Sequence, residues 1–415
     1  MQDRMTQTYI NKYFYLLFLF TLAFGIVFYN LICVFLKFDY TDEVSALLLF
    51  ILFSVFLFTT KDWEMNKVFL ATLFIFLFYL FYSFYIQSNT GIGIFSDLFI
   101  QIKPYLAFFC VYSMTPRFDR DQKSILKSLS LLFWGGLFLI GIASLFQPDI
   151  IKLFMFHETY YAAAVITTSL CYFYCSSFSS LDKLVFLLML SIGIFSGRSK
   201  FYGFYALSVF VILFFSNIKQ FRWNFRNILI LLSMLAVMTF VAWEKIYLYF
   251  YQSITDEVEK DMIARYVLYV TSPDILRDYF PFGSGFASYA THVSGLYYSH
   301  IYTDYGIDGV WGLSRRHHSF VADTYYPSLV QFGVAGIVLY ILFWVYICKR
   351  AFAFYGKTKN IHFLIISILI VGFLGIEGTS DSTFISNRGV FVMMLLGLIL
   401  AEMKQEQQEL PGEKG

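Results

Sequence analysis

Charged residues are scarce in this chain of 415 residues: Asp, Glu, Lys and Arg make up 14% of it, against 59% hydrophobic residues. So little charge excludes an ordinary soluble domain, because long apolar runs are stable only in surroundings as apolar as themselves. The formal net charge is only +2, so the charge balance gives no reason to expect a nucleic-acid partner. A basic and aromatic stretch at residues 219–226 is typical of an anchor at anionic lipid headgroups.

Cysteine is also rare, and the chain contains five. All five fall within or beside apolar runs, so the polar segments have no disulfide to hold them together. Cys171 and Cys175 lie one helical turn apart, a spacing that a metal or redox pair could share, but buried free cysteines usually serve packing. The chain shows no internal repeat of fixed period and no low-complexity linker.

Apolar runs of membrane length recur along almost the whole chain. Windows of about twenty residues predict twelve transmembrane helices, near 13–36, 44–60, 68–87, 97–115, 126–146, 159–178, 182–197, 201–217, 228–243, 326–347, 361–377 and 389–403. The first run is too long for a signal-peptide core and no small-residue cleavage site follows it. We therefore predict an all-α polytopic membrane protein divided into nine helices, one large loop, three helices and a polar tail, over residues 1–243, 244–325, 326–403 and 404–415.

Lys and Arg are distributed unevenly between the two sides of these predicted helices. If the N-terminus is cytoplasmic, eighteen fall in inside segments and five in the short outside connections, namely Lys37, Lys152, Arg198, Lys200 and Arg388. Cytoplasmic loops of membrane proteins carry the excess of Lys and Arg. The pattern predicts that both termini are cytoplasmic and that the large loop faces outward.

Three cations stand within or at the ends of predicted membrane helices. Lys103 precedes Pro104 inside the window 97–115, where an ionisable group is costly unless it meets a cavity or a partner. It either contacts substrate at the bend that the proline makes or extends toward the outer interface near Asp97. Arg198 and Lys200 form the tip of a tight hairpin, and guanidinium is well shaped to hold phosphate oxygens. The alternative role for this tip is an interfacial anchor.

The large loop begins with an arginine on an aromatic helix face. In the stretch MIARYVLY, Arg265 is either an ion-pair partner of Asp261 or a clamp on substrate. Further on, Gly283-Ser284-Gly285 permits close approach of the backbone, but no strand precedes it and the pattern alone is a weak sign of phosphate binding.

The end of the loop is dense in groups that move protons. Four of the six histidines lie in the loop, two of them in RRHHSFVAD, which spans residues 315–323. Imidazole can take a proton from a hydroxyl, and a nearby carboxylate can orient it or act as the base itself. Adjacent histidines point in different directions, so at most one is catalytic, and HHxxxxD lacks the spacing of a zinc helix, so we predict no metal. The candidates are His318 and Asp323 for catalysis, and Arg315, Arg316 and His317 for substrate contact.

These features together resemble a known family. The order of about a dozen spans, a hairpin tipped by SGRSKFYG, an outward loop with an early arginine, then FGSGF and HHSFVADTYYPSLVQFGVAG, is similar to the O-antigen polymerase and O-antigen ligase superfamily. The likeness covers the chain from the fourth span to the eleventh, and its most specific part is YYPSLVQFGVAG. Where ligases often show His-Asn before the helix that follows the loop, this chain has Ala322-Asp323.

The resemblance implies a metal-independent, inverting glycosyltransferase with a GT-C-like fold and no cofactor. Its donor and acceptor would be glycans linked to polyprenyl diphosphate, and membrane lipids and a chain-length regulator protein would be its partners. The family's two arginines carry over to Arg198 and Arg265 as diphosphate ligands, and Lys200 and Lys103 are further candidates. The general base stays open between His318 and Asp323.

We therefore expect a repeat-unit polymerase in the cytoplasmic membrane of a bacterium, acting at its outer face. The alternatives are a ligase that moves the finished glycan to a lipid or protein acceptor, and a polysaccharide flippase or other transporter. A transporter should carry ionisable groups in the middle of several helices and have short loops. Here the ionisable groups are concentrated in one outward loop, which favours the enzyme.

Overall fold

The described part of the chain is helical throughout. The computed structural model describes residues 2–60, 66–216 and 260–409, and these contain no β-strand. The first half runs as α1 (Gln2–Phe20), the π-helical segment η1 (Thr21–Val27), α2 (Tyr29–Leu36), α3 (Thr41–Thr59), α4 (Lys67–Tyr85), α5 (Gly91–Met114), α6 (Arg120–Ser144), α7 (Ile150–Met155) and α8 (Glu158–Tyr174). The remainder comprises α9 (Ser180–Ser191), η2 (Ile192–Ser196), α10 (Ser199–Ser216), α12 (Lys260–Asp278), α13 (His292–Leu296), α14 (Ile301–Asp304), η4 (Pro327–Phe332), α15 (Gly333–Thr358), α16 (Ile361–Glu377), η5 (Thr383–Ile385) and α17 (Asn387–Glu409).

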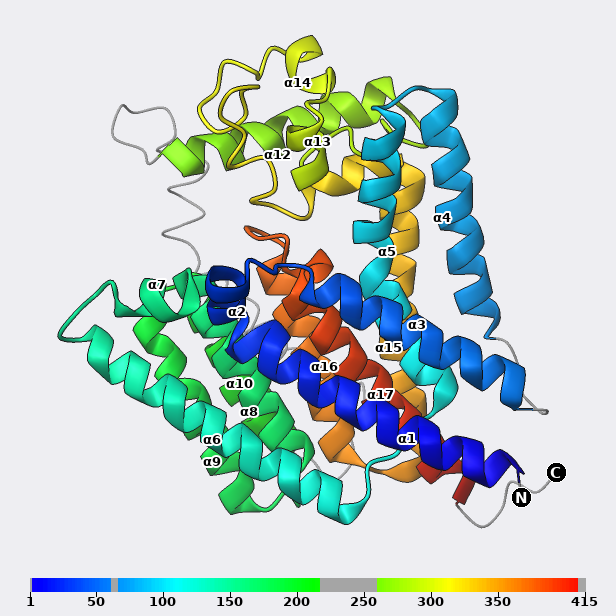
Figure 1. Cartoon of the computed structure of the whole chain (residues 1–415), viewed down its shortest axis with the longest axis vertical. Helices are drawn as coiled ribbons and strands as arrows, with labels where there is room; N and C mark the ends of the chain where they lie inside the picture. Colours follow the sequence, from blue (N-terminus) through cyan, green and yellow to red (C-terminus); the bar gives the residue numbers. More distant parts are fainter. Residues whose placement is uncertain (1, 61–65, 217–259, 410–415) are drawn as a thin grey trace.

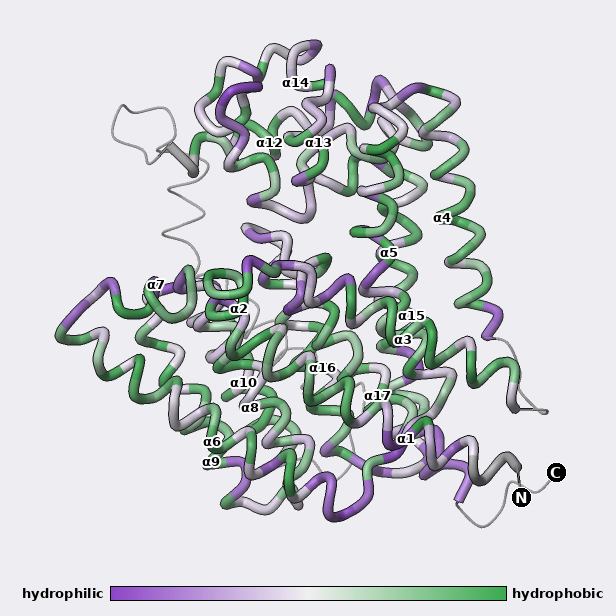
Figure 2. The backbone as a smooth tube through the Cα atoms, viewed as in Figure 1, coloured by the Kyte–Doolittle hydropathy of each residue, from purple (hydrophilic) through white to green (hydrophobic). Residues whose placement is uncertain are grey.

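Six of these helical stretches are long and apolar enough to cross a membrane: Thr6–Val27, Thr41–Thr59, Lys67–Tyr85, Gly91–Met114, Arg120–Ser144 and Pro327–Thr358. Two shorter apolar helices accompany them, at Ser199–Phe215 and Ile361–Glu377. Many large apolar side chains of the bundle helices are exposed, and most of the backbone tube of these helices is coloured hydrophobic in Figure 2. Such a surface matches hydrocarbon rather than water, and the chain is a multi-pass membrane protein.

Polar capping residues define where several helices begin. Asp119 forms a capping box with Gln122 at the start of α6, and Asn66 and Asn360 accept backbone hydrogen bonds at the starts of α4 and α16. Caps satisfy amides that the first helical turn leaves unpaired. Between the caps, runs of Phe, Leu and Ile continue each helix, so the predicted windows within the described residues fall on helices. The predicted span 228–243 and the start of the loop lie outside the described residues.

One predicted membrane span has no lipid-facing surface. Every residue of α17 from Asn387 to Met403 is buried, and the helix packs against α5, α15 and α16 in the middle of the bundle (Figure 1). Gly397 permits this packing, because a Cβ there would lie 2.7 Å from the carbonyl oxygen of Phe108 in α5. The apolar run at 389–403 therefore fills a protein interior.

The large loop forms a small layer of its own. Helices α12, α13 and α14 lie at one end of the molecule, and both termini lie toward the other end (Figure 1). The layer has a separate apolar core, which includes Leu268, Ile275, Tyr289, Tyr302 and Leu313. The bundle and the loop layer thus have separate hydrophobic cores, and the polar residues discussed below lie between them.

The FGSGF segment attaches the loop to α4 and α5. Gly283 and Gly285 have φ of +82° and +81°, and a Cβ on Gly283 would lie 2.2 Å from the backbone nitrogen of Gly333. The amide of Ala287 donates to Asp97 at 2.7 Å, and Ser88 donates to the carbonyl of Phe286 at 2.8 Å. These glycines therefore allow the FGSGF segment to pack closely against other segments of this chain.

Candidate functional site

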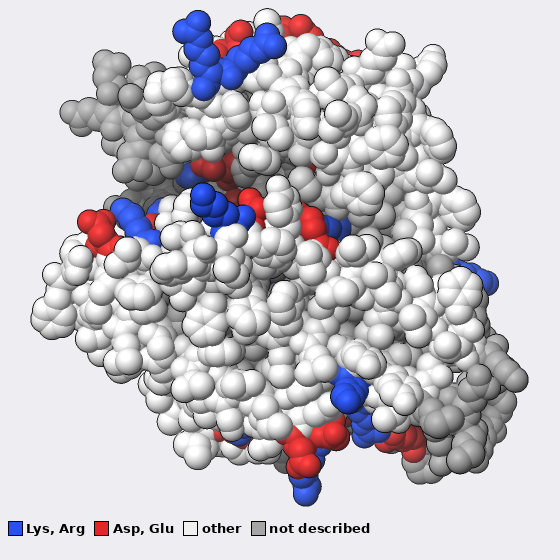
Figure 3. Space-filling view, viewed as in Figure 1, with Lys and Arg blue, Asp and Glu red and all other residues white. Residues whose placement is uncertain are grey.

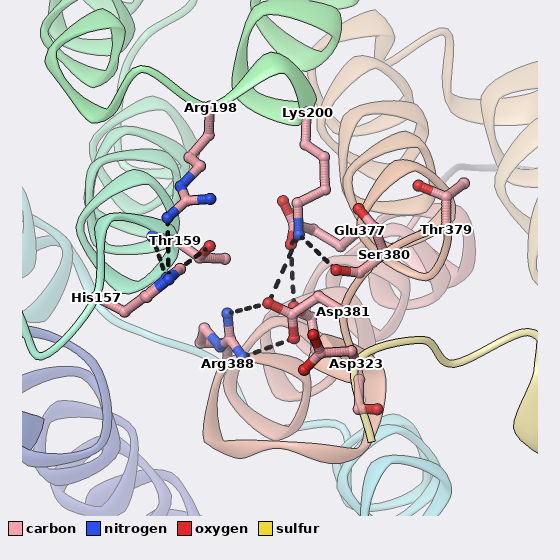
Figure 4. Close-up of polar contacts among 12 residues, drawn as sticks. His157, Thr159, Arg198, Lys200, Asp323, Glu377, Thr379, Ser380, Asp381 and Arg388 are labelled. Atoms are coloured by element: carbon pink, nitrogen blue, oxygen red, sulfur yellow. Dashed lines mark hydrogen bonds and ion pairs between the residues drawn. The ribbon is translucent and has the colours of Figure 1, made fainter. Parts of the chain in front are cut away.

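A recess separates the loop layer from the ends of the bundle helices beneath it. In Figure 3, acidic and basic side chains gather in this hollow, while most of the surrounding face carries neither. Figure 4 shows the side chains that meet there, from the starts of α8, α10 and α17, the end of α16 and the connection after it. These segments are far apart in sequence, so the fold assembles the site.

Arg198 lies at the start of α10 because the chain turns just before it. Segment η2 is followed by Gly197, whose φ of +62° favours glycine. Nη2 of Arg198 then lies 2.6 Å from Oε2 of Glu158 and 2.9 Å from Nε2 of His157. Nδ1 of the same ring accepts a hydrogen bond from the backbone N–H of Thr159 at 3.2 Å, and it lies 3.0 Å from the hydroxyl of that residue.

The ionisation of this trio follows from its surroundings. Burial, and then the charge of Arg198, lower the pKa of His157. Burial raises the pKa of Glu158, but hydrogen bonding and the charge of Arg198 outweigh it and the pKa lies below its ordinary value. At neutral pH the ring is therefore neutral, and the carboxylate and guanidinium are charged.

Lys200 and Arg388 share one carboxylate. Nζ of Lys200 lies 2.9 Å from Oε2 of Glu377 and 3.6 Å from Oδ2 of Asp381. Arg388 binds both oxygens of Asp381, at 3.1 and 2.9 Å, and its guanidinium stacks 4.3 Å from the ring centroid of Tyr160. Burial raises the pKa of Asp381, but Arg388 and then Lys200 outweigh it and hold that pKa well below its usual range.

The loop contributes a further ion pair to the recess. Nη2 of Arg265 in α12 donates to Oδ2 of Asp323 at 2.9 Å, and both side chains are mostly buried. The segment that carries Asp323 rests on the connection after α16, because Ser382 donates to the carbonyl of Ala322 at 2.5 Å. Nearby, the hydroxyl of Tyr269 in α12 donates to the carbonyl of Thr379 at 2.7 Å. Asp323 therefore lies on the loop side of the cluster in Figure 4.

The predicted histidines have different surroundings. The ring of His318 is partly buried against Gly295 in α13, and within the described ranges its Nδ1 is buried without a hydrogen-bond partner. His317 is exposed, and its ring lies tilted against that of Trp311, with 4.6 Å between centroids.

Three other predicted residues do not join the cluster of the recess. Arg315 and Arg316 are exposed on the loop. Lys103 is buried in an ion-pair trio, 2.5 Å from Oδ2 of Asp42 and also bonded to Glu43 at the start of α3. It therefore does not extend toward Asp97.

Five residues of the recess were missed in the sequence reasoning: His157, Glu158, Glu377, Asp381 and Arg388. The available signal was the stretch GIEGTSDSTFISNRG at residues 375–389, where two carboxylates and an arginine lie at the edges of two predicted membrane windows. From sequence alone, Arg388 contributes only to the count of outside charges. Arg198 in the hairpin is about forty residues from its partners at the start of α8, His157 and Glu158. No local sequence pattern therefore joins them.

Four cations of the described residues meet four carboxylates in the recess, and Lys152 also lies 3.6 Å from Glu158 and from Asp149 at its edge. Arg198, Lys200, Arg265 and Arg388 are each paired with an acid in the contacts above, so the set is close to neutral. An anionic ligand would have to displace carboxylates from cations, and a displaced carboxylate could then accept a proton. Among the described residues, no three His, Cys, Asp or Glu side chains are grouped so that they could hold a metal ion.

Comparison with protein-family models and with curated proteins gives no match for this chain.

Proposed function

We propose that this chain is a membrane glycosyltransferase that polymerises oligosaccharide units linked to polyprenyl diphosphate. The observation that carries the proposal is the convergence of Arg198, Lys200, Arg265 and Arg388 in one recess between membrane helices and the loop. A diphosphate leaving group develops negative charge as its bond to the sugar breaks, and preorganised cations stabilise that charge. The cations come from three separate segments of the chain. An anchor at a lipid headgroup would need cations from a single helix only.

The chemistry requires a base as well as cations. The acceptor hydroxyl oxygen would attack the anomeric carbon, the bond from that carbon to the diphosphate oxygen would break, and the electron pair would leave with the diphosphate. The hydroxyl proton would pass to a side chain of the recess. We propose Asp323 as this base, because Arg265 already holds its carboxylate at the cluster, whereas the ring of His318 packs against α13. Binding of the donor to Arg265 would release the carboxylate for this role.

The proposed setting is the outer face of the bacterial cytoplasmic membrane, with both termini cytoplasmic. It rests on the distribution of Lys and Arg along the chain and on the placement of the termini away from the loop layer in Figure 1. The donor glycan would then reach the recess from the outer leaflet.

A transporter is the second candidate, because one observation favours it. Lys103 in α5 is buried with Asp42 and Glu43 of α3, and both helices are long enough to cross a membrane. Buried ionisable groups inside spans are common along transport pathways.

Glycan transfer by the purified full chain distinguishes these activities. The substrate is a polyprenyl-diphosphate oligosaccharide of the repeat unit, and we expect a ladder of products that grow by one unit. Transfer only to a lipid or protein that lacks a polyprenyl chain would indicate a ligase. Substrate passage across proteoliposomes with no new glycosidic bond would indicate a transporter and overturn the proposal.

A further inference from the structure

An apolar groove runs between two membrane-spanning helices and ends beside the polar recess. It has a volume of about 220 Å³ and lies between α4 and α15, with α5 and η4 as its floor. On α4 it is lined from Val68 to Tyr79, along one face of the helix. Eleven helical steps extend about 16 Å, so the groove follows the helix for much of its length.

The groove lies where only an apolar occupant is stable. Both of its walls, Lys67–Tyr85 and the helix within Pro327–Thr358, are long and apolar enough to cross a membrane. Side chains such as Ile75 and Leu339 form its lining. Water would find few polar partners there, whereas a hydrocarbon chain would bury its surface against these side chains.

One lining residue of the groove, Tyr325, lies next to segments of the recess. Tyr325 lines the groove and is the second residue after Asp323. Its amide donates to the carbonyl of Gly378 at 3.1 Å, and Gly378 follows Glu377 directly. Its ring also lies 5.2 Å from that of Phe384, between centroids. A chain lying in the groove would thus place its headgroup among the cations and carboxylates of the recess.

We propose that this groove binds the polyprenyl chain of the diphosphate-linked substrate. The inference rests on the proposed function, because the recess selects the headgroup and the groove receives the lipid that carries it. A bulk phospholipid would also fit an apolar groove, but the position of Tyr325 beside the cationic recess favours a chain whose headgroup is a phosphate ester bound there.

Photocrosslinking of the full chain in nanodiscs tests this assignment. The probe is a polyprenyl monophosphate with a photoreactive group in its chain, and the second arm is phosphatidylglycerol with the same group in an acyl chain. Adducts are located by peptide mass spectrometry. We expect the polyprenyl probe to label groove residues of α4 and α15, and the phosphatidylglycerol probe to label them at least about fivefold less.

Variants that fill the groove provide the decisive comparison. Ile75→Trp and Leu339→Trp fill it from opposite walls, so a folding defect in one leaves the other informative. Each should reduce groove labelling at least fivefold, whereas Leu77→Trp, at an exposed position of α4 that does not line the groove, should keep wild-type labelling. Unchanged labelling in both filled variants, or equal labelling by phosphatidylglycerol, would overturn the assignment.

The outcome is separable from that of the proposed function. Groove labelling by the polyprenyl probe without any glycan transfer would retain the lipid site and remove the polymerase. A product ladder with labelling confined to other helices would retain the polymerase and remove this site.

Discussion

The guanidinium of Arg265 and the carboxylate of Asp323 are paired at 2.9 Å although 58 positions separate them in sequence. The pair joins α12 of the loop layer to the segment that rests on the connection after α16. In the proposed reaction the two side chains have opposite tasks, because one binds the leaving group and the other accepts a proton. In that reaction their pairing would keep the proposed base occupied until an anion reaches Arg265.

Replacement of the proposed base gives the first prediction. Asp323→Asn should lower glycan transfer by about 10²–10⁴-fold, the usual contribution of a positioned general base, since the amide cannot accept the proton. His318→Ala should lower it by less than about tenfold. The measurement is turnover by purified variants, with Asp274→Asn as the control, because Asp274 is an exposed acid of α12. A larger loss in His318→Ala than in Asp323→Asn would transfer the role of base to the histidine.

The planar guanidinium group of arginine gives the second prediction. Arg198→Lys and Arg265→Lys keep the charge but lose the planar arrangement of donors that matches phosphate oxygens. We expect transfer to fall at least tenfold in each, with normal protein levels. The matched control is Arg277→Lys, an exposed arginine of α12. Wild-type polymer yield and chain length in both recess variants would rule out the diphosphate role.

Acid should weaken the trio of His157, Glu158 and Arg198. The pKa of His157 is lowered in the folded chain, so the unfolded chain binds more protons just below the ordinary histidine pKa of about 6.5. The free energy of unfolding should therefore fall as the pH decreases from about 6.5 toward the folded-state pKa of His157. Above about pH 6.5, His157 should cause no change in it. Thermal unfolding of wild type and His157→Gln between pH 7.5 and 5 measures this. A pH slope that is identical in the two proteins would contradict the assignment.

The attachment of the loop to the bundle should depend on one glycine. In Gly283→Ala the new Cβ would approach backbone atoms of Gly333 and residues 330–331 within 2.2–2.6 Å, at a φ of +82°. Backbone strain of this kind costs about 1–3 kcal/mol, and the close contacts add to it. Limited proteolysis should show faster cleavage in the loop. Gly309→Ala is the control, because nothing lies within 4 Å of the added Cβ; equal cleavage of the two variants would show that the attachment does not need this glycine.

The outward orientation of the loop can be tested with a single cysteine. Ser294 is unsuitable because it is buried and bonded to Thr291 and Tyr302, whereas Ser319 is exposed. Ser319→Cys should react with a membrane-impermeant reagent in cells whose outer membrane alone is permeable, and Asp121→Cys, at the predicted cytoplasmic start of α6, should not. The reverse pattern would invert the topology.

Hydropathy predicted the positions of the helices along the chain better than it predicted whether lipid or protein surrounds each helix. Apolar windows located the described helices because burial in lipid and burial in protein select the same side chains. For that reason the window 389–403 could not be recognised as a central helix, and it corresponds to the fully buried part of α17. Six helical stretches of the described residues are long and apolar enough to cross a membrane. The hydropathy windows predict twelve spans across the whole chain.

The candidate site was predictable only where a side chain is unusual in its own segment. Arg198, Lys200 and Arg265 stood out because cations are rare among apolar neighbours. Their distant partners did not, since no local spacing joins Arg265 to Asp323, with which it pairs 58 positions away. Similarly, Lys103 meets Asp42 across 61 positions, and pairing at such distances depends on helix packing that no local spacing encodes.

The burial of α17 also determines how freely different parts of the chain can change over evolutionary time. An exposed apolar position of a membrane helix, such as Phe58 of α3, would border fluid lipid chains that adapt to any apolar side chain, so Leu, Ile or Met can replace it with little effect. A position within α17 borders fixed side chains, and an added or lost methylene there must be matched by a neighbour. Two helices of similar hydropathy therefore differ in their freedom to diverge, and α17 should accumulate substitutions slowly and in compensating pairs.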